Sequence, residues 1–494
     1  MIKPDYDTLI IGSGAAGLIA SIALAESGFR VLVCTKDAVT ESSSAYAQGG
    51  IAVSLAPDDS IESHIQDTLR VGQGLCDEKI VRFFIGAIEE YVEVLAEWGV
   101  PFIGLRRGQI DPSVLAREGA HSHRRVLKVG SDISGRALMK ALWEIVCRNP
   151  NISISQGTSL IKLIQSPVDG AVIGGAFQDI NNNFFQVGAS ATIIASGGFS
   201  SIFHRSTNPF VSTGDGIVCG AEIGALVRKL EYVQFHPTAI DLPNCFLLSE
   251  ALRGEGSHLI NVFGERFMNK YAPAEMELAP RAVVSGAVWK EIQATGKVYL
   301  DARPLGLDCI KTRFPNIYAG CLSMGYDLSK EMLPITPAAH YTIGGLAVDE
   351  QLRSTVKNLW AIGEVSSTGL HGADRLASNS LLECVVSGFK AAESIKSSIQ
   401  GGQPVEELPP LKLINTDDQF SILDAREMSK ELKWKLWQQA SFHFSQKGLY
   451  ELLDYINVVK SKLPDGLSNN TFANQLLRQT QMSEMYVKAC LAAN

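Results

Sequence analysis

The chain has 494 residues, of which 46% are hydrophobic and 19% are charged, and its formal net charge is −8. A chain of this length buries a substantial core and is long enough for about three domains. A negative net charge without a basic run argues against nucleic-acid binding, and the sequence contains no apolar run of about 18 residues that would span a membrane.

The nine cysteines are scattered and form no CxxC pair. This pattern is typical of reduced thiols and not of a disulfide framework or of a zinc or iron–sulfur site. Met1 is followed almost directly by the first apolar run, which leaves no room for a signal peptide. We therefore expect a cytoplasmic protein that has no membrane anchor and no metal centre.

The first apolar run, Thr8–Ile11, is a predicted strand that leads into the sequence GSGAAG at residues 12–17. A helix is predicted over Leu18–Glu26 and a second strand over Val31–Cys34. Strand, GxGxxG, helix and strand within about 30 residues form the fingerprint of a dinucleotide-binding fold. Thr35 and Lys36 stand where NAD-binding proteins carry the acid that holds the ribose, so the pattern argues against NAD.

The next segments suggest a ligand-binding edge. Residues 40–50 are small and polar, which suits a close approach of the backbone to a ligand, and a helix is predicted over Ile80–Trp98. Buried strands are predicted at Ala191–Ala195 and Asn358–Ile362, and Glu364 follows the second one. Ligands bind at the carboxyl ends of strands in open α/β sheets, so we expect a site there.

The region 236–340 differs from the segments on either side, because its predicted elements are short and are separated by Pro and Gly. The predicted fold class is α/β: a Rossmann-like cofactor-binding domain (1–235 and 341–402) that is interrupted by an α+β capping domain (236–340). A linker at 401–410 precedes a C-terminal helical domain (411–494), where apolar residues recur with helical spacing.

Arg375 lies just before Asn379 and Ser380, which are a start signal for the apolar helix Leu381–Ile395. A helix N-terminus presents free N–H groups and a partial positive charge, which suits an electron-rich cofactor edge. The neighbouring guanidinium could hold a carboxylate in a planar two-point contact. The alternative is a surface Arg before an ordinary capped helix.

Three more cationic or titratable residues have distinctive settings: His236, Arg281 and His340. Two of them lie at the predicted cap boundaries and one lies inside the cap, so a single cleft could gather them with Arg375 into a site for a small dianion. Arg253, between Glu250 and Glu255, could join this site or could instead brace the cap through ion pairs.

A second cluster spans Arg117–Arg125. His121 and His123 have a spacing that is known from metal sites, but no Cys or carboxylate completes a ligand set. Glu118, a carboxylate among Arg and His residues, is expected to stay ionised. It could hold a substrate ammonium group, or it could be a structural residue in a salt bridge.

Six motifs in chain order resemble the flavoprotein family of succinate dehydrogenase and fumarate reductase, and together they extend over most of the chain from Tyr6 to Ile395. The motifs are Tyr46–Ile51, Arg117–Arg125, Gln234–Thr238, Glu250–Gly256, Pro337–Thr342 and His371–Glu383. The resemblance implies FAD as the cofactor. In this family Ser or Thr followed by Lys is usual after the second strand, which fits Thr35 and Lys36.

Two positions distinguish the branches of this family. Respiratory members bind FAD covalently through a His at the position of Ser43, so the resemblance implies noncovalent FAD here. Glu118 matches the residue that orients the substrate amino group in the branch that oxidises L-aspartate. The resemblance thus implies oxidation of L-aspartate to iminoaspartate, the first step of NAD biosynthesis. The electrons would pass to O₂, giving H₂O₂, or to fumarate, and the product to quinolinate synthase.

The resemblance also assigns residue roles. His236, His340 and Arg375 would fix the two substrate carboxylates, assisted by Arg253, and Arg281 would handle the proton or stabilise charge. The cofactor-binding residues that the glycine motif and the resemblance imply are Gly12, Ser13, Gly14, Ala15, Ala16, Gly17, Lys36, Ser43, Ser44, Ala45, Tyr46, Ala47, Gln48, Gly49, Gly50, Asp215, Glu364, Ser380 and Leu381.

Two alternatives remain open at this point. A soluble fumarate reductase would use the same carboxylate-binding residues in the reverse reaction. An FAD-binding subunit without turnover would be expected to have lost some of these residues, whereas His236, Arg281, His340 and Arg375 are all present. The sequence does not distinguish between O₂ and fumarate as the electron acceptor.

Overall fold

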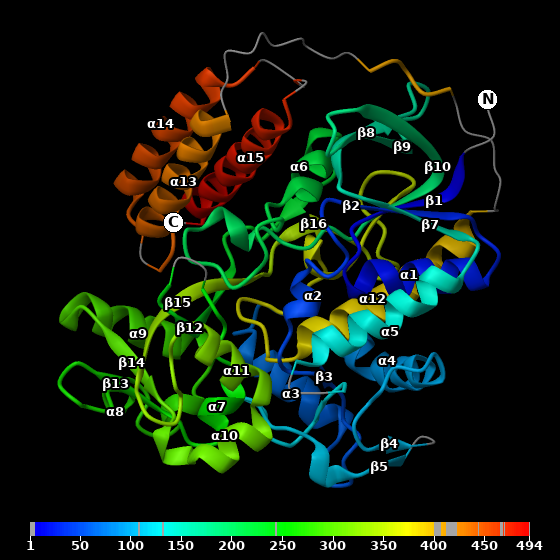
Figure 1. Cartoon of the computed structure of the whole chain (residues 1–494). Coiled ribbons are helices and arrows are strands. Elements are labelled where there is room, and N and C mark those ends of the chain that lie inside the picture. The colour runs from blue at the N-terminus through cyan, green and yellow to red at the C-terminus, as the bar shows by residue number, and fades with distance from the viewer. Residues whose placement is uncertain are drawn as a thin grey trace.

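The structure is a computed structural model that describes residues 5–106, 109–130, 133–242, 245–399, 407–411, 422–442, 444–464, 468 and 470–493. Figure 1 shows a sheet at the upper right with helices below it, a second unit at the lower left and three helices at the upper left. Most of the predicted linker at 401–410 lies outside the described residues. No helix among the described residues is long and apolar enough to cross a membrane.

Five parallel strands form the centre of a seven-stranded sheet. In spatial order they are β7 (Ile152–Gln156), β2 (Val31–Thr35), β1 (Tyr6–Ile11), β10 (Phe184–Ile194) and β17 (Leu359–Ala361). β1, β2, β10 and β17 are mostly buried apolar residues, as expected for parallel strands that are covered on both faces. The predicted α/β fold class with a parallel sheet is confirmed.

The strand β10 belongs to two arrangements at once. Its second half pairs in parallel with β1 and β17, while its first half pairs antiparallel with β9 (Val172–Asp179), and β9 pairs with β8 (Thr158–Gln165). The sheet therefore continues beyond the nucleotide-binding core as an antiparallel extension, which Figure 1 shows at the upper right.

Four helices pack on one face of the parallel strands and on one another: α1 (Ala15–Glu26), α4 (Glu78–Glu97), α5 (Ser134–Arg148) and α12 (Asn379–Ser398). Eleven of the twelve residues of α1 are buried, because the helix lies between the sheet and α12. We call the central sheet with these four helices the sheet part.

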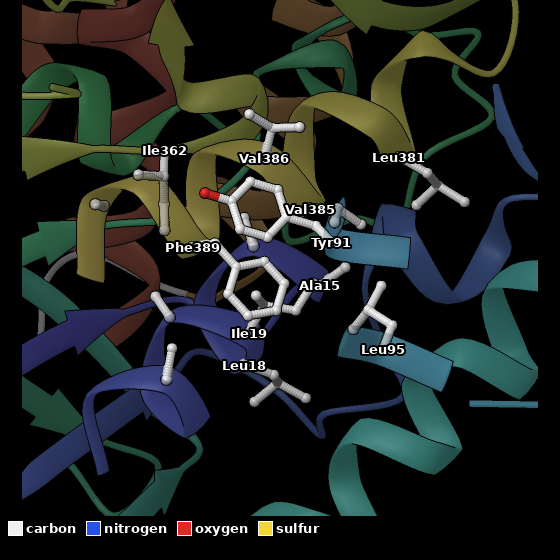
Figure 2. Packing of buried hydrophobic residues seen from close by; sticks show 14 of the residues in the cluster. Ala15, Leu18, Ile19, Tyr91, Leu95, Ile362, Leu381, Val385, Val386 and Phe389 are labelled. Carbon is white, nitrogen blue, oxygen red and sulfur yellow. The ribbon is translucent and has the colours of Figure 1, made fainter. Parts of the chain in front are cut away.

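Figure 2 shows how α1, α4 and α12 interlock. Leu18 and Ile19 of α1 lie beside Phe389 of α12, and the ring of Phe389 stacks on Tyr91 of α4 with centroids 4.5 Å apart. Each fully buried side chain of this size contributes roughly 1.5–3 kcal/mol to stability. This packing fixes the N-termini of α1 and α12, and the start of α12 lines the cavity described below.

A four-stranded antiparallel sheet forms the second unit, which we call the cap. Its strands, in spatial order, are β12 (Val233–Ile240), β15 (Leu333–Thr342), β14 (Val298–Asp301) and β13 (His258–Asn261). Its helices are α7 (Glu250–Gly254), α8 (Met268–Tyr271), α9 (Arg281–Thr295), α10 (Leu307–Arg313) and α11 (Pro315–Ser323). The cap has an apolar core of its own.

The chain enters and leaves the cap on paired strands. β12 and β15 are hydrogen-bonded to each other, and His236 lies opposite Ala338. The expected cap boundaries at 236 and 340 both fall inside these two strands. The division of the chain into domains at these residues stays a prediction.

The C-terminal region is helical, as predicted, and consists of α13 (Ile422–Gln439), α14 (Gln446–Lys462) and α15 (Thr471–Ala492). These helices share an apolar cluster with the other face of the central sheet and with α6 (Asp215–Glu222). Arg478 of α15 also forms an ion pair with the exposed carboxylate of Glu222 at 2.5 Å. The C-terminal helices thus pack on α6 and reach the antiparallel extension of the sheet through Asn474 and Arg478.

The remaining elements are short and connect these parts. They are α2 (Ser43–Tyr46), β3 (Ile51–Ala52), α3 (Ile61–Val71), β4 (Leu105–Arg106), β5 (Gln109–Ile110), β6 (Val126–Leu127), β11 (Val227–Arg228), β16 (Gly345–Ala347) and β18 (Ser366–Ser367). The polar segment 40–50 thus contains one turn of helix, capped by the Ser42 side chain.

Candidate functional site

An open cavity lies where the sheet part meets the cap. Segment 43–50, strands β12 and β15, the start of α9 and the start of α12 line it. The residues singled out from the sequence that line it are Ser43, Ser44, Tyr46, Ala47, Gln48, Gly49, Gly50, Glu118, His236, Arg281, His340, Glu364, Arg375, Ser380 and Leu381. The structure therefore brings together residues that are more than 300 positions apart in the chain.

The glycine turn lies between β1 and α1, as predicted. Gly12 has φ +115°, and a Cβ there would lie 2.2 Å from the Ala195 carbonyl oxygen. Gly14 occupies the N-cap position of α1, and a Cβ there would meet only the Ser44 hydroxyl oxygen, at 3.4 Å. That hydroxyl accepts a hydrogen bond from Ala15 N–H at 3.1 Å. The turn leaves room for a pyrophosphate at a helix N-terminus.

Lys36 and Asp215 lie next to each other beyond the lining of the cavity. The Lys36 ammonium is 2.8 Å from the Asp215 carboxylate and 3.0 Å from the Thr213 hydroxyl. Burial acts to raise the pKa of Asp215, but Lys36 outweighs it and the pKa is lowered. Nearer the turn, the Ser13 hydroxyl donates to the Thr35 hydroxyl at 2.8 Å.

Glu364 follows β17 and faces the cavity, as the strand prediction placed it. Its carboxylate accepts from Thr342 N–H at 2.8 Å and from the Thr342 hydroxyl at 3.1 Å. Burial raises the pKa of Glu364 to about 7. A buried carboxylate with spare oxygen lone pairs suits the hydroxyl groups of a sugar. The glycine turn, this acceptor and the cavity together fit FAD.

His236 and His340 lie side by side on β12 and β15, with ring centroids 5.2 Å apart. Burial, followed by the charge of Arg281, lowers the pKa of both rings well below the usual value, so both are neutral near pH 7. The Nδ1 atom of His236 accepts from Thr238 N–H at 3.2 Å, so its Nε2 carries the proton. The Nδ1 atom of His340 lies 2.8 Å from the Thr207 hydroxyl.

Arg375 lies in the loop before α12, with its guanidinium carbon 4.4 Å from the centroid of the Tyr341 ring. Burial and the nearby Arg281 lower the pKa of Arg375 to about 10, which leaves it cationic near pH 7. Its Nη1 donates to the Ser380 hydroxyl at 3.3 Å, whereas its buried Nε has no hydrogen-bond partner among the described residues. A donor therefore remains for a ligand carboxylate.

Arg281 is the first residue of α9 and faces the same cavity from the cap. Its Nε donates to Glu250 at 2.8 Å, and its Nη1 donates to the Gln234 side-chain oxygen at 3.0 Å. Burial acts to lower the pKa of Arg281, but the carboxylates of Glu250 and Glu118 raise it above the usual value. Arg281 is therefore a firmly cationic group.

Arg253 lies behind Glu250 and does not line the cavity. Its Nη2 is 3.5 Å from Glu250, and its Nη1 donates to the Glu277 carbonyl oxygen. The other flanking acid, Glu255, pairs with Arg313 at 2.7 Å. These contacts agree with the bracing alternative for Arg253, and a direct contact with substrate stays a prediction.

Glu118 is buried beside the start of α12, where its carboxylate accepts from the Ser378 hydroxyl at 2.7 Å. Burial and the charge of Glu250 raise its pKa, against the opposing charge of Arg281. The ionised state expected from its Arg and His neighbours in the sequence stays a prediction, because burial opposes it and the charge of Arg281 favours it. A substrate ammonium group would add a further positive charge beside this carboxylate.

The sequence neighbours of Glu118 are occupied elsewhere. Arg117 donates to the His121 carbonyl oxygen at 2.9 Å, and Arg125 pairs with Asp59 at 2.8 Å. His121 donates from Nε2 to the Ala377 carbonyl oxygen at 2.9 Å, and burial lowers its pKa to about 4. Within the described residues no group of three or more His, Cys, Asp or Glu could hold a metal ion.

Three residues at or beside the cavity escaped the sequence reasoning. Tyr341 and Ser378 line the cavity, and Gln234 accepts a hydrogen bond from Arg281. The signal that could have found all three is their place inside the matched motifs. The left-handed φ of Ser378, +62°, and its bond to Glu118 exist only in the folded chain.

Comparisons with known proteins agree with this geometry. A family model described as an FAD binding domain matches residues 7–381. An L-aspartate oxidase from Nostoc sp. is 41% identical over 460 residues, which cover 90% of this chain and 77% of the relative. An L-aspartate oxidase from Vibrio cholerae is 38% identical over 501 residues, with 98% and 93% coverage.

Solved structures show the same architecture. A quinol–fumarate reductase with menaquinol molecules superimposes with a TM-score of 0.86 and 26% identity, covering 99% of this chain and 90% of that one. Sdh1 from Mycobacterium smegmatis superimposes with a TM-score of 0.81 and 27% identity, covering 98% and 86%.

Proposed function

The chain belongs to the L-aspartate oxidase family of FAD-binding flavoproteins, and we propose that its cleft oxidises L-aspartate to iminoaspartate. One observation carries the proposal: a buried carboxylate, Glu118, lies in the same cavity as two neutral histidines and two arginines. This set complements a molecule that has two carboxylates and one ammonium group. A dicarboxylate without an amine would bring negative charge near Glu118 and would offer no ammonium group to that carboxylate.

The carboxylates of the substrate are held from two sides. Arg375 offers its free Nε and its positive charge, while neutral His236 offers a proton on Nε2. His340, whose ring lies beside that of His236, is the third residue that would hold the substrate carboxylates. Donors fixed in advance by strand pairing and ring packing orient the substrate without reorganising, which favours a productive geometry.

FAD would be held by the glycine turn, by Ser44, by Glu364 and by segment 43–50, and when bound it accepts a hydride. Aspartate then loses the hydrogen on Cα with its electron pair and one proton from nitrogen, which leaves the imine. Two electrons pass on to O₂, giving H₂O₂, or to fumarate, giving succinate.

Arg281 lies opposite the carboxylate-binding residues and contacts Glu250. At its raised pKa it is a poor base and a poor proton donor, so we assign it to stabilising negative charge on the substrate. Glu250 also lies 3.5 Å from Arg253, which is further from the cavity than Arg281.

The remaining partners follow from the chemistry. Imines hydrolyse in water, so the product would be used rapidly by quinolinate synthase. The nine cysteines are all free, which favours the cytoplasm as the compartment. Ser43 offers a hydroxyl and no ring nitrogen, so we propose that FAD is bound noncovalently.

The test is to incubate the pure protein with FAD and L-aspartate and to measure H₂O₂ and iminoaspartate. L-Alanine, which lacks the second carboxylate, is the control substrate and should give no turnover. A soluble fumarate reductase is the second candidate, because the same donors suit fumarate. Fumarate reduction without aspartate oxidation would favour that candidate and contradict our proposal.

A further inference from the structure

The helix that carries Arg281 has no cap of its own. Its N-cap residue is Pro280, whose side chain cannot accept a hydrogen bond, and its first turn reads Arg281, Ala282, Val283 without an acid. The first N–H groups of a helix need acceptors, and a side-chain cap normally takes the N–H at the second or third position. In α9 the second position is Ala282.

The missing acceptor comes from the sheet part, 92 residues further along the chain. An oxygen of Asp374, in the loop before α12, accepts from Ala282 N–H at 3.4 Å. Asp374 is buried, so water does not screen its interaction with the positive end of α9. This contact joins the cap to the sheet part at the base of Arg281.

The second oxygen of Asp374 is linked to the Arg281 side chain through Gln234. It accepts from the Gln234 side-chain N–H at 2.5 Å, and Gln234 also donates to the Arg375 carbonyl oxygen at 2.7 Å. The oxygen of the Gln234 amide accepts from Arg281 Nη1 at 3.0 Å. Asp374 is thus linked to both the backbone and the side chain of the Arg281 position.

We propose that Asp374 is a positioning residue that caps α9 from the sheet part and thereby fixes Arg281 opposite Arg375 when the cap lies over the cleft. The proposal rests on the function proposed above. Asp374 has no contact with the substrate in this scheme; it acts through Ala282 and Gln234.

The test compares two variants of the FAD-loaded enzyme. Asp374→Ala removes both acceptors, and we expect kcat for L-aspartate to fall about 10-fold or more, because small displacements of a catalytic group are costly. KM should stay within about 3-fold, since His236, His340 and Arg375 remain. Asp374→Asn keeps one oxygen acceptor and should keep kcat within about 3-fold of the parent enzyme.

A second readout does not depend on activity. Hydrogen–deuterium exchange of the peptide spanning residues 279–292 should accelerate in Asp374→Ala and not in Asp374→Asn. The matched control is Ser445→Ala, which removes the local cap of α14 in the C-terminal region. It should alter neither kcat nor exchange at α9.

Three outcomes would overturn the proposal: unchanged kcat in Asp374→Ala, equal losses in the Ala and Asn variants, or an equal loss in Ser445→Ala. If the parent enzyme did not oxidise L-aspartate, the proposed function would fail by itself. The exchange experiment would still decide whether Asp374 caps α9.

Discussion

In the sheet part, the residues expected to bind FAD are mainly backbone groups and small side chains held by a large apolar core. On the cap side, Arg281 is long and charged, and it is held by polar contacts to Glu250 and Gln234. Apolar packing tolerates few changes of backbone shape, whereas a polar network tolerates few changes of charge. Substitutions in the sheet part should therefore weaken FAD binding, whereas substitutions on the cap side should lower the turnover rate.

The largest effect is expected for Gly12→Ala, which tests the sheet side. The new Cβ would lie 2.2 Å from the Ala195 carbonyl oxygen at a φ of +115°, so the turn must move. We expect FAD occupancy to be lost, with destabilisation on the order of 3 kcal/mol, measured by flavin absorbance and by thermal unfolding.

The matched control for this change is Gly28→Ala. Gly28 also has a positive φ, +86°, but a Cβ there meets nothing within 4 Å. It should cost about 1 kcal/mol and leave FAD bound. Equal loss of FAD in both variants would mean that general instability, and not the shape of the turn, controls cofactor binding.

Arg281→Leu tests the cap side and should lower turnover by about 100-fold or more while FAD stays bound. The change removes the cation and leaves Glu250 with only Arg253 as a close positive partner. Steady-state kinetics and flavin absorbance are the measurements. Arg303→Leu, an exposed cap arginine paired with Asp301, is the control and should be near normal. Full activity in Arg281→Leu would remove this residue from the chemistry.

Glu118→Gln should separate the two candidate functions. If Glu118 pairs with the substrate ammonium, losing a charged hydrogen bond of about 1.5–3 kcal/mol lowers kcat/KM for aspartate roughly 10- to 150-fold. Fumarate reduction, assayed with an artificial electron donor, should be largely unchanged because fumarate has no amine. Equal losses with both substrates would make Glu118 structural and favour the fumarate reductase alternative.

A smaller effect is expected from pH on the binding of succinate, a dicarboxylate without an amine. The pKa values of His236 and His340 are well below 6.5, so no imidazolium is lost near neutrality, whereas Arg375, with a pKa of about 10, loses its charge only at high pH. Affinity should fall as the pH rises through about 10, where Arg375 loses its charge, and Glu364, with a pKa of about 7, should add a weaker decline near neutrality as its carboxyl group becomes negative.

Succinate titrations of the flavin spectrum in the Glu118→Gln background measure this dependence without the ionisation of Glu118. An affinity that stayed constant as the pH rose through about 10 would mean that the charge of Arg375 does not hold the carboxylates.

The smallest effect is expected at Ser43. Ser43→Ala should change FAD occupancy little, because Ser43 is one of several residues of segment 43–50 that line the cavity. Acid precipitation should release the yellow chromophore from the parent protein and from the variant alike. Flavin that stays on the precipitated parent polypeptide would show a covalent link and would contradict the noncovalent proposal.

Local patterns in the sequence were enough for the nucleotide-binding core. The strand β1, the glycine turn and α1 follow one another within 30 residues, and their spacing depends on backbone conformation and helical periodicity. The C-terminal helices could be predicted for the same reason. The expected segments at Ala191–Ala195 and Asn358–Ile362 lie within one residue of the buried ends of β10 and β17.

The sequence also singled out His236, Arg281, His340 and Arg375 as one group, and the cavity contains all four. It did not determine which charges have partners. Arg253 lies behind Glu250, and Glu118 is separated from the Arg and His residues that surround it in the sequence. The reason is that charge pairing depends on distances across the fold, which chain spacing does not encode.

Only the tertiary structure decided how the two sides of the cleft are joined. Ala282 and Asp374 are 92 positions apart, and no periodicity in the chain relates a helix that lacks a cap to a carboxylate in another part of the molecule. β12 and β15 bring the two sides together by pairing over a separation of about a hundred residues. Propensities act over a few residues, whereas the burial that sets the pKa of Glu118 and the reach of Asp374 arises from the packed arrangement of both parts.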